Sequence, residues 1–233
     1  MKLAVMQPYF LPYIGYFQLI NAVDKFVLLD DVNYINRGWI NRNRIAINQQ
    51  PHWLTIPLER ASQNRLINEI SLHRDSLWRE KLCLTVKTNY SKAPFFEMVY
   101  PIFENILKFP SVDLSAFLHH SLKEILSYLK ITTLIVPTSV VYPKNDLKGQ
   151  YRILDICQRE GATIYLNPPG GKELYECELF HAAGINLYFL EPDLQGMNLV
   201  SGINQGTVLS ILDLMMLNHP NLIRQNLACY QLV

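Results

Sequence analysis

Arginine and asparagine crowd into one polar segment of this chain, between residues 33 and 44. Arginine offers a planar fork of donors that matches carboxylate or phosphate, and asparagine adds neutral donors and acceptors. The segment therefore predicts a site for a small anionic ligand. Its members are Asn33, Asn36, Arg37, Asn41, Arg42, Asn43 and Arg44, and we expect Arg37 and residues 41–44 to bind the ligand.

The run Asn41-Arg42-Asn43-Arg44 alternates in a way that separates its side chains if the backbone is extended. Successive side chains of a strand point to opposite faces, so the two arginines share one face and the two asparagines share the other. Arg42 and Arg44 would then clamp an anion together. The alternative is a solvated hairpin whose arginines pair with the nearby acids Asp30 and Asp31.

Asp30 and Asp31 are the candidate catalytic acids, since they directly follow the apolar run Phe26-Val27-Leu28-Leu29. Either could serve as a base or as a metal ligand in a transfer reaction. No metal site is predicted elsewhere, because the four cysteines form no CxxC pair and the histidines lack ligand spacing. The cofactor is left open, and a nucleotide with magnesium is compatible with the site.

The loop Gln7 to Tyr13 follows the first β-prone run and leads into a helical pattern. Unpaired amides and the dipole at a helix N-terminus favour an anion such as phosphate or carboxylate. We expect Gln7 to orient the reacting groups and Tyr13 to contact the ligand. The competing interpretation is that this proline-aromatic loop only turns the chain and plugs the core.

A third loop, Asn167 to Lys172, lies between a predicted strand and a predicted helix. The paired glycines Gly170 and Gly171 could expose backbone amides to an anion, while Lys172 neutralises it. The loop does not have the Walker A sequence. A plain turn with a surface lysine is an equally acceptable interpretation.

Strands and helices alternate around these loops. Apolar runs predict strands over 2–6, 26–29, 53–58, 133–136, 163–166 and 187–190, and three- and four-residue spacing predicts helices from 13, over 149–160 and over 174–183. This order favours an α/β fold with a mostly parallel sheet covered by helices. Ligands bind outside the carboxyl ends of such strands, so we expect the three loops to meet there.

A helical middle section interrupts the alternation. Residues 76–90, 94–108 and 114–129 each carry apolar residues at helical spacing, which defines a helical subregion over 75–130 within a single domain spanning 1–233. These helices should pack on one another as much as on the sheet.

Asp213, an acid inside an apolar run, is expected to meet an arginine or to cap a helix.

Charge and composition exclude several classes of function. The chain has 21 basic and 20 acidic residues, so it exerts no strong field on nucleic acid or on an anionic membrane, and a small anionic substrate is the expected partner. Gln7 and Pro8 end the first apolar run too early for a signal peptide, and no run approaches the ~20 apolar residues of a membrane span. The cytoplasm is the expected compartment. Common hydrolase and dehydrogenase motifs are missing.

These residues together resemble the WbqC-like protein family, over almost the whole chain. The resemblance rests on Gln7-Pro8 with Pro12 and Gly15, on Asp24 with Phe26-Val27 and Asp30-Asp31, on Asn41-Arg42-Asn43-Arg44-Ile45 followed by Trp53-Leu54-Thr55-Ile56-Pro57, on Tyr90 with Ala93-Pro94-Phe95-Phe96, on Tyr165-Leu166 with Gly170-Gly171-Lys172, and on Leu209-Ser210-Ile211-Leu212-Asp213. Met6 stands where members usually carry a histidine before Gln-Pro.

The resemblance implies a bacterial transferase of surface-polysaccharide (O-antigen) or related small-molecule biosynthesis, acting with an anionic activated donor of aminoacyl, acyl or nucleotide-linked type. The alternative is a non-catalytic module that binds a nucleotide or nucleotide sugar. A more distant similarity, in the layout of residues 6–24, is to nucleotidyltransferases. Tyr13 and Tyr16 occupy the histidine positions there, so the layout supports the fold more than the reaction.

Overall fold

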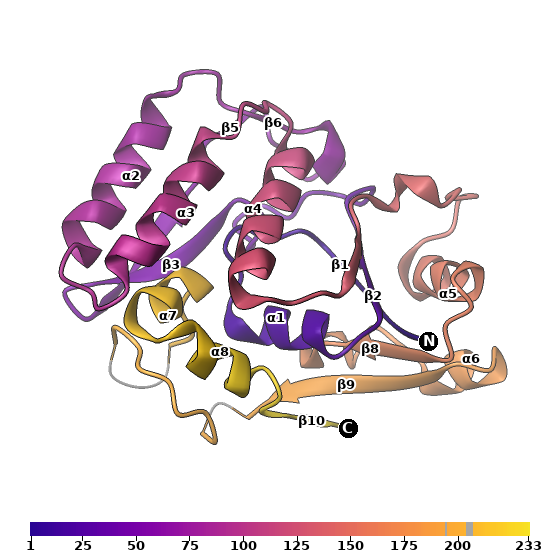
Figure 1. Cartoon of the computed structure of the whole chain (residues 1–233). Coiled ribbons are helices and arrows are strands. Elements are labelled where there is room, and N and C mark those ends of the chain that lie inside the picture. Colours follow the sequence, from indigo (N-terminus) through magenta and orange to yellow (C-terminus); the bar gives the residue numbers. More distant parts are fainter. Residues whose placement is uncertain (194, 204–206) are drawn as a thin grey trace.

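The computed structural model describes residues 1–193, 195–203 and 207–233. Its main sheet has six strands in the order β10-β9-β8-β1-β2-β7 (Figure 1). Neighbouring strands pair in parallel except β10, which runs antiparallel to β9. The α/β fold with a mostly parallel sheet is therefore confirmed. The bounds are β1 Lys2–Met6, β2 Lys25–Leu28, β7 Leu134–Val136, β8 Ile164–Asn167, β9 Asn186–Pro192 and β10 Tyr230–Leu232.

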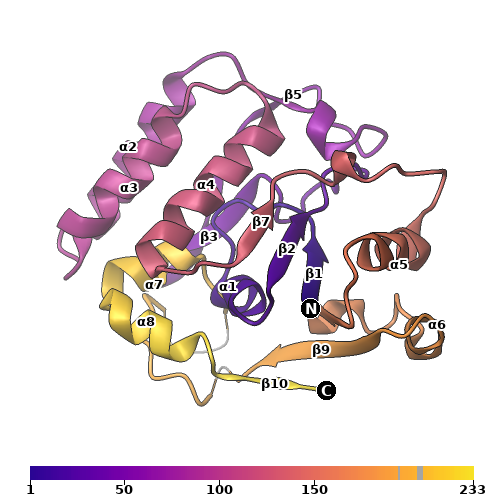
Figure 2. The ribbon, with the colours of Figure 1, turned by 45° about the vertical axis from the view of Figure 1, so that its right-hand side comes forward.

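Helices cover both faces of this sheet, as the uninterrupted apolar runs of its strands require. In β1, Leu3 and Val5 pack into the core beneath α5 (Gly149–Arg159) and α6 (Cys177–Ala182), whereas Ala4 packs into the larger core on the other side. Figure 2 shows α1 (Ile14–Asn21) and α4 (Leu114–Leu129) on that second side of β1 and β2, opposite α5.

The strand order reverses direction at the centre of the sheet. From β1 the chain proceeds through β2 to β7 on one side, and it later returns to β8, beside β1, and continues outward to β9. The connection from β1 to β2 passes through α1, and the connection from β7 to β8 passes through α5. In open α/β sheets such a switch point leaves a crevice at the carboxyl ends of the strands, where ligands bind.

The helical middle section is present as expected. It consists of α2 (Leu77–Tyr90), α3 (Phe96–Lys108) and α4, which stand side by side in Figures 1 and 2. Their buried side chains belong to the same core as α1, so the section is continuous with the body of the protein. The three helices pack on one another, as predicted.

The sequence did not predict two short helices near the C-terminus, α7 (Ile211–Leu217) and α8 (Pro220–Asn226), or strand β10 that follows them. The run 209–217 is almost wholly apolar, so it carries no helical periodicity to distinguish it from a strand. Buried Gln18 of α1 holds this region to the core: its Nε2 donates to the carbonyl oxygens of Asn226, at 2.9 Å, and Cys229, at 2.8 Å.

The predicted strand over 53–58 differs from the structure. Strand β4 covers Gln50–Thr55 and pairs with β3 (Arg42–Ile47) in a hairpin separate from the main sheet. Pro57, which has no amide proton for a ladder, separates β4 from a second small sheet of β5 (Leu58–Glu59) and β6 (Ser71–Leu72). The described residues also form short 3-10 turns, η1 (Ile67–Glu69), η2 (Ser139–Val141) and η3 (Pro169–Gly171).

Nowhere in the described parts of the chain does a helix have the length and apolar character that crossing a membrane requires.

Asp213 takes neither of its two expected roles in the described residues, since the residue that caps α7 is Ser210. This buried carboxylate meets no arginine among the described residues. It accepts hydrogen bonds from the Tyr90 hydroxyl at 2.7 Å and from the backbone amide of Gly202 at 2.9 Å. The Tyr90 hydroxyl in turn accepts from the amide of Ala46. Asp213 thus joins α7 to α2 and to the hairpin through neutral donors.

The Asp213 carboxyl predicts a pH effect on stability. Burial raises its pKa above the ordinary value of 3.8, so the protonated form favours the folded state. That contribution is complete below pH 3.8 and is lost as the pH rises through the folded-state pKa. In urea titrations, the unfolding free energy of the parent minus that of Asp213→Asn should therefore fall as the pH rises from 3.8 to neutrality. A constant or rising difference would contradict this assignment.

Candidate functional site

The hairpin of β3 and β4 is fixed to the rest of the protein by its two buried asparagines. The side-chain amide of Asn43 donates to the carbonyl oxygens of Phe10, at 3.2 Å, and Leu11, at 2.8 Å. Asn41 donates to the carbonyl of Ile56 and accepts from the Tyr34 hydroxyl, both at 2.7 Å. Asn43 therefore holds the hairpin against the Gln7–Tyr13 loop and also lines the pocket described below. Asn41 instead joins the residue before β3 to Tyr34 and to Ile56, just after β4.

Arg42 and Arg44 lie on the opposite, half-exposed face of β3, as the alternation of the sequence indicates. The Arg42 guanidinium lies 4.1 Å from the centre of the Trp53 ring and donates to the carbonyl oxygens of Arg37 and Gly38. The backbone of Arg37 thus supports Arg42, while the residue itself is exposed. Neither Asp30 nor Asp31 pairs with these arginines within the described chain, so the pairing expected in the solvated-hairpin interpretation is not present.

Arg44 lines a pocket of about 410 Å³ together with the first loop. That volume lies within the range of small-molecule sites. Its guanidinium is 5.2 Å from the Trp39 ring centre, and the Tyr13 ring folds back over Gly15, where a Cβ atom would come within 2.4 Å of it. The lining residues are Tyr9, Pro12, Tyr13, Trp39, Asn43, Arg44 and Val208.

The charge of this pocket, which we call the Arg44 pocket, is positive. Arg44 forms no ion pair in the described chain, and its other polar contact is a long hydrogen bond, 3.4 Å, to the carbonyl of Val208. Burial raises the pKa of Tyr9 to about 12 and also raises that of Tyr13, so both phenols stay neutral at physiological pH. The pocket therefore offers one guanidinium and neutral aromatic walls.

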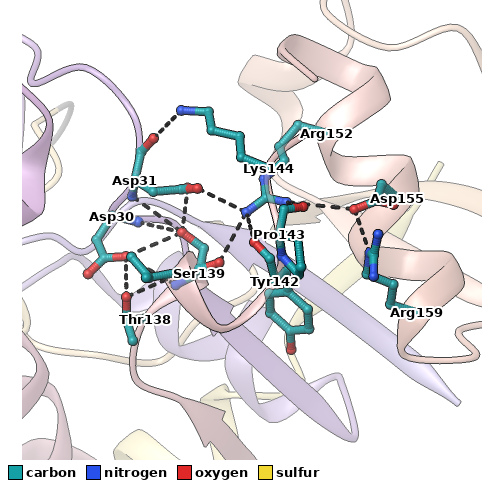
Figure 3. A network of polar contacts seen from close by, with 11 residues as sticks. Asp30, Asp31, Thr138, Ser139, Tyr142, Pro143, Lys144, Arg152, Asp155 and Arg159 are labelled. Atoms are coloured by element: carbon teal, nitrogen blue, oxygen red, sulfur yellow. Dashed lines mark hydrogen bonds and ion pairs between the residues drawn. The ribbon is translucent and has the colours of Figure 1, made fainter. Parts of the chain in front are cut away.

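Asp30 and Asp31 lie elsewhere, in a buried network at the carboxyl ends of β2 and β7 (Figure 3). Asp30 accepts from the hydroxyls of Ser115, at 2.5 Å, and Thr138, at 2.8 Å. The Ser139 hydroxyl donates to Asp31 at 2.5 Å. These contacts engage both carboxylates and link the ends of the two strands. Neither acid is among the residues that line the Arg44 pocket.

Arg152 of α5 is the positive partner of this network. Its side chain is buried, and its Nη2 donates to Asp31 at 2.9 Å and to the carbonyl oxygens of Ser139 and Tyr142. Figure 3 shows the guanidinium between Asp31 and Asp155. Sequence analysis did not identify Arg152, since its acidic partner is 121 residues away.

The third loop also lies outside the Arg44 pocket. Lys172 pairs with Glu191 of β9 at 2.6 Å, and Gly171 is buried against the Asn167 side chain, whose amide would collide with a Cβ atom there. Gly170 is exposed. These contacts fit the alternative of a plain turn with a surface lysine.

Gln7 stands at the end of β1, and its carbonyl accepts from the Tyr16 hydroxyl at 2.9 Å.

The sequence led us to expect that the three loops converge on one pocket. The structure shows that they do not. Arg44 and Tyr13 meet, joined by two aromatic residues, Tyr9 and Trp39, that the sequence analysis did not select. Both aromatic residues stand in segments that the sequence had singled out, Tyr9 in the first loop and Trp39 between Arg37 and Arg42, so their position was the available signal.

The six-stranded, mostly parallel sheet with helices on both faces defines a doubly wound α/β protein. Comparison with known proteins is specific: the WbqC-like protein family matches residues 7–225, and the chain belongs to this family. It is 31% identical over 197 residues to "Uncharacterized protein Rv1507c" of Mycobacterium tuberculosis, covering 82% of this chain and 83% of that relative. No solved structure matches with significance.

The buried pair of Arg152 and Asp31 predicts a large effect on stability. Arg152→Met keeps an unbranched apolar stem but removes the guanidinium and leaves Asp31 buried without its cation, so the unfolding free energy should fall by about 3–5 kcal/mol. Denaturant unfolding measures this change. Arg159→Met, which removes the exposed partner of Asp155, is the matched control and should cost much less. Equal losses in the two variants would refute the importance of the buried pair.

Proposed function

We propose that the protein is a transferase of bacterial surface-polysaccharide or related small-molecule biosynthesis, and that it holds an anionic activated donor in the Arg44 pocket. The donor is of aminoacyl, acyl or nucleotide-linked type. The observation that carries the proposal is a guanidinium without an ion-pair partner in the described chain, in a pocket whose only other polar side chains are neutral. Such a site favours a ligand with one anionic group.

The aromatic walls support a ligand that also carries a ring. Trp39 and Trp53 lie 5.5 Å apart with both rings partly exposed, and Arg44 contacts both. Trp39 reaches the pocket together with Tyr9 and Tyr13. Flat rings of this kind stack on sugars and bases, while the phenol hydroxyls donate hydrogen bonds to polar substituents. In a transfer reaction the guanidinium would stabilise charge that develops on the donor.

A second candidate, a non-catalytic module that binds a nucleotide or nucleotide sugar, is favoured by one observation. The described lining of the pocket contains no carboxylate, imidazole or thiol that could accept a proton. Asp30 and Asp31, the expected bases, are engaged in the network of Figure 3. A transferase using this pocket would therefore depend on positioning and charge stabilisation, or on a base carried by the acceptor.

A ligand screen separates the two candidates. Thermal shift with nucleotide sugars, nucleoside triphosphates and amino acids, with and without magnesium, identifies a ligand, and longer incubation with acceptors tests for product. Binding with turnover supports the transferase. Binding without turnover under every acceptor condition supports the module, and no ligand shift in the whole screen would contradict both.

Arg44→Ala should weaken binding of the identified ligand about tenfold to a hundredfold, the usual loss for a charge-assisted hydrogen bond. Isothermal titration calorimetry measures the affinity. Arg42→Ala should have a smaller effect, because Arg42 stacks on Trp53 and is not among the residues that line the pocket. Arg74→Ala, at an exposed arginine paired with Glu59, is the control. Unchanged affinity in Arg44→Ala would disprove the assignment.

A further inference from the structure

A second cavity, of about 440 Å³, lies at the start of α5, and it shares no residue with the Arg44 pocket. Leu29, just after β2, and Ile153 of α5 form part of its apolar wall, and Tyr175 adds a ring from the segment before α6. The cavity therefore has the volume and the apolar surface to hold a small organic molecule.

Three cations line this cavity, Lys144, Lys148 and Arg152. The Lys144 ammonium donates to the backbone carbonyl of Asp31 at 2.5 Å, so this contact leaves its charge without a counter-charge (Figure 3). Lys148 is exposed and has no ion pair within the described chain. Of the three, Arg152 is the one paired with carboxylates in the described chain, Asp31 at 2.9 Å and Asp155 at 3.6 Å, and neither acid lines the cavity. The balance of charge around the cavity is positive.

The amino end of α5 adds to this positive field. Lys148 is the N-cap residue with an extended backbone, and its side chain does not cap the helix. Gly149 and Gln150, the first residues of the helix, both line the cavity. Unpaired amides at a helix start attract anions. Two hydrogen bonds of 2.8 Å hold the Gln150 side chain: it donates to the carboxylate of Glu176 and accepts from the backbone amide of Glu176. These bonds fix this side of the cavity.

A buried donor in the same wall lacks an acceptor. Arg152 is 1% exposed and lines the cavity, and its Nε has no hydrogen-bond partner in the described chain although its Nη atoms are fully engaged. A buried N–H group without a partner is costly, and native structures contain few of them. This observation is independent of the helix terminus, and it leaves one more uncompensated positive donor in a residue of the cavity wall.

We propose that this cavity is a binding site for an organic phosphate. Lys144, Lys148 and the first amides of α5 bind the phosphate, since lysine binds phosphate as a point charge. The body of the ligand lies against Leu29, Ile153 and Tyr175. The site is separate from the function proposed for the Arg44 pocket and does not depend on it.

Amide chemical shifts test the site on the intact chain. Titration with AMP and with phenyl phosphate should shift the amide signals of Gly149 and Gln150, and adenosine, which lacks the phosphate, should shift them much less. Lys148→Glu should weaken the apparent affinity for both phosphates about tenfold or more, because it reverses a charge beside the anion. Lys87→Glu, at an exposed lysine of α2, is the matched control and should change nothing.

Failure of this proposal is distinguishable from failure of the proposed function. If neither phosphate shifts Gly149 and Gln150, or if Lys148→Glu binds as the parent does, the cavity is not a phosphate site. Arg44→Ala should leave these shifts unchanged, whether or not the Arg44 pocket binds a donor. Loss of the shifts in Arg44→Ala would show that the phosphates bind there instead, and would overturn the assignment.

Discussion

One buried charge organises the carboxyl edge of the sheet. The guanidinium of Arg152 is 1% exposed, and a cation so buried is tolerable only when fixed acceptors surround it. Asp31 and three backbone carbonyls supply them, so the end of β2, the segment after β7 and the start of α5 must all be in place at once. The cavity at the start of α5 depends on this arrangement.

The fold was largely predictable because its strands are buried on both faces. Such strands are continuous apolar runs, as in β1 and β2, and helices between them keep a three- and four-residue spacing. The errors occur where that contrast disappears. Run 209–217 is apolar except for Ser210 and Asp213, so helix α7 could not be distinguished from a strand. Pro57 marks a break between two small sheets that lie apart from the main sheet.

The candidate site was predictable only in its local part. Alternation along β3 placed Arg42 and Arg44 correctly on one face, because side-chain direction follows from the backbone alone. The surroundings of Asp31 were not predictable, because its partner Arg152 is remote in sequence. The segment after β7 also follows a parallel strand. It has neither the paired glycines of the third loop nor the clustered arginines of the second, so its sequence did not mark it as a binding loop, yet it carries Lys144 and Lys148.

The buried amide of Gln18 has a consequence for how the chain reaches its native state. Its donors are satisfied by the carbonyl oxygens of Asn226 and Cys229, which are made more than two hundred residues later. Until that late segment leaves the ribosome, the first helix would bury an unsatisfied amide against the sheet. Synthesis of α1 therefore precedes its stable docking, which waits for the carbonyl groups of Asn226 and Cys229.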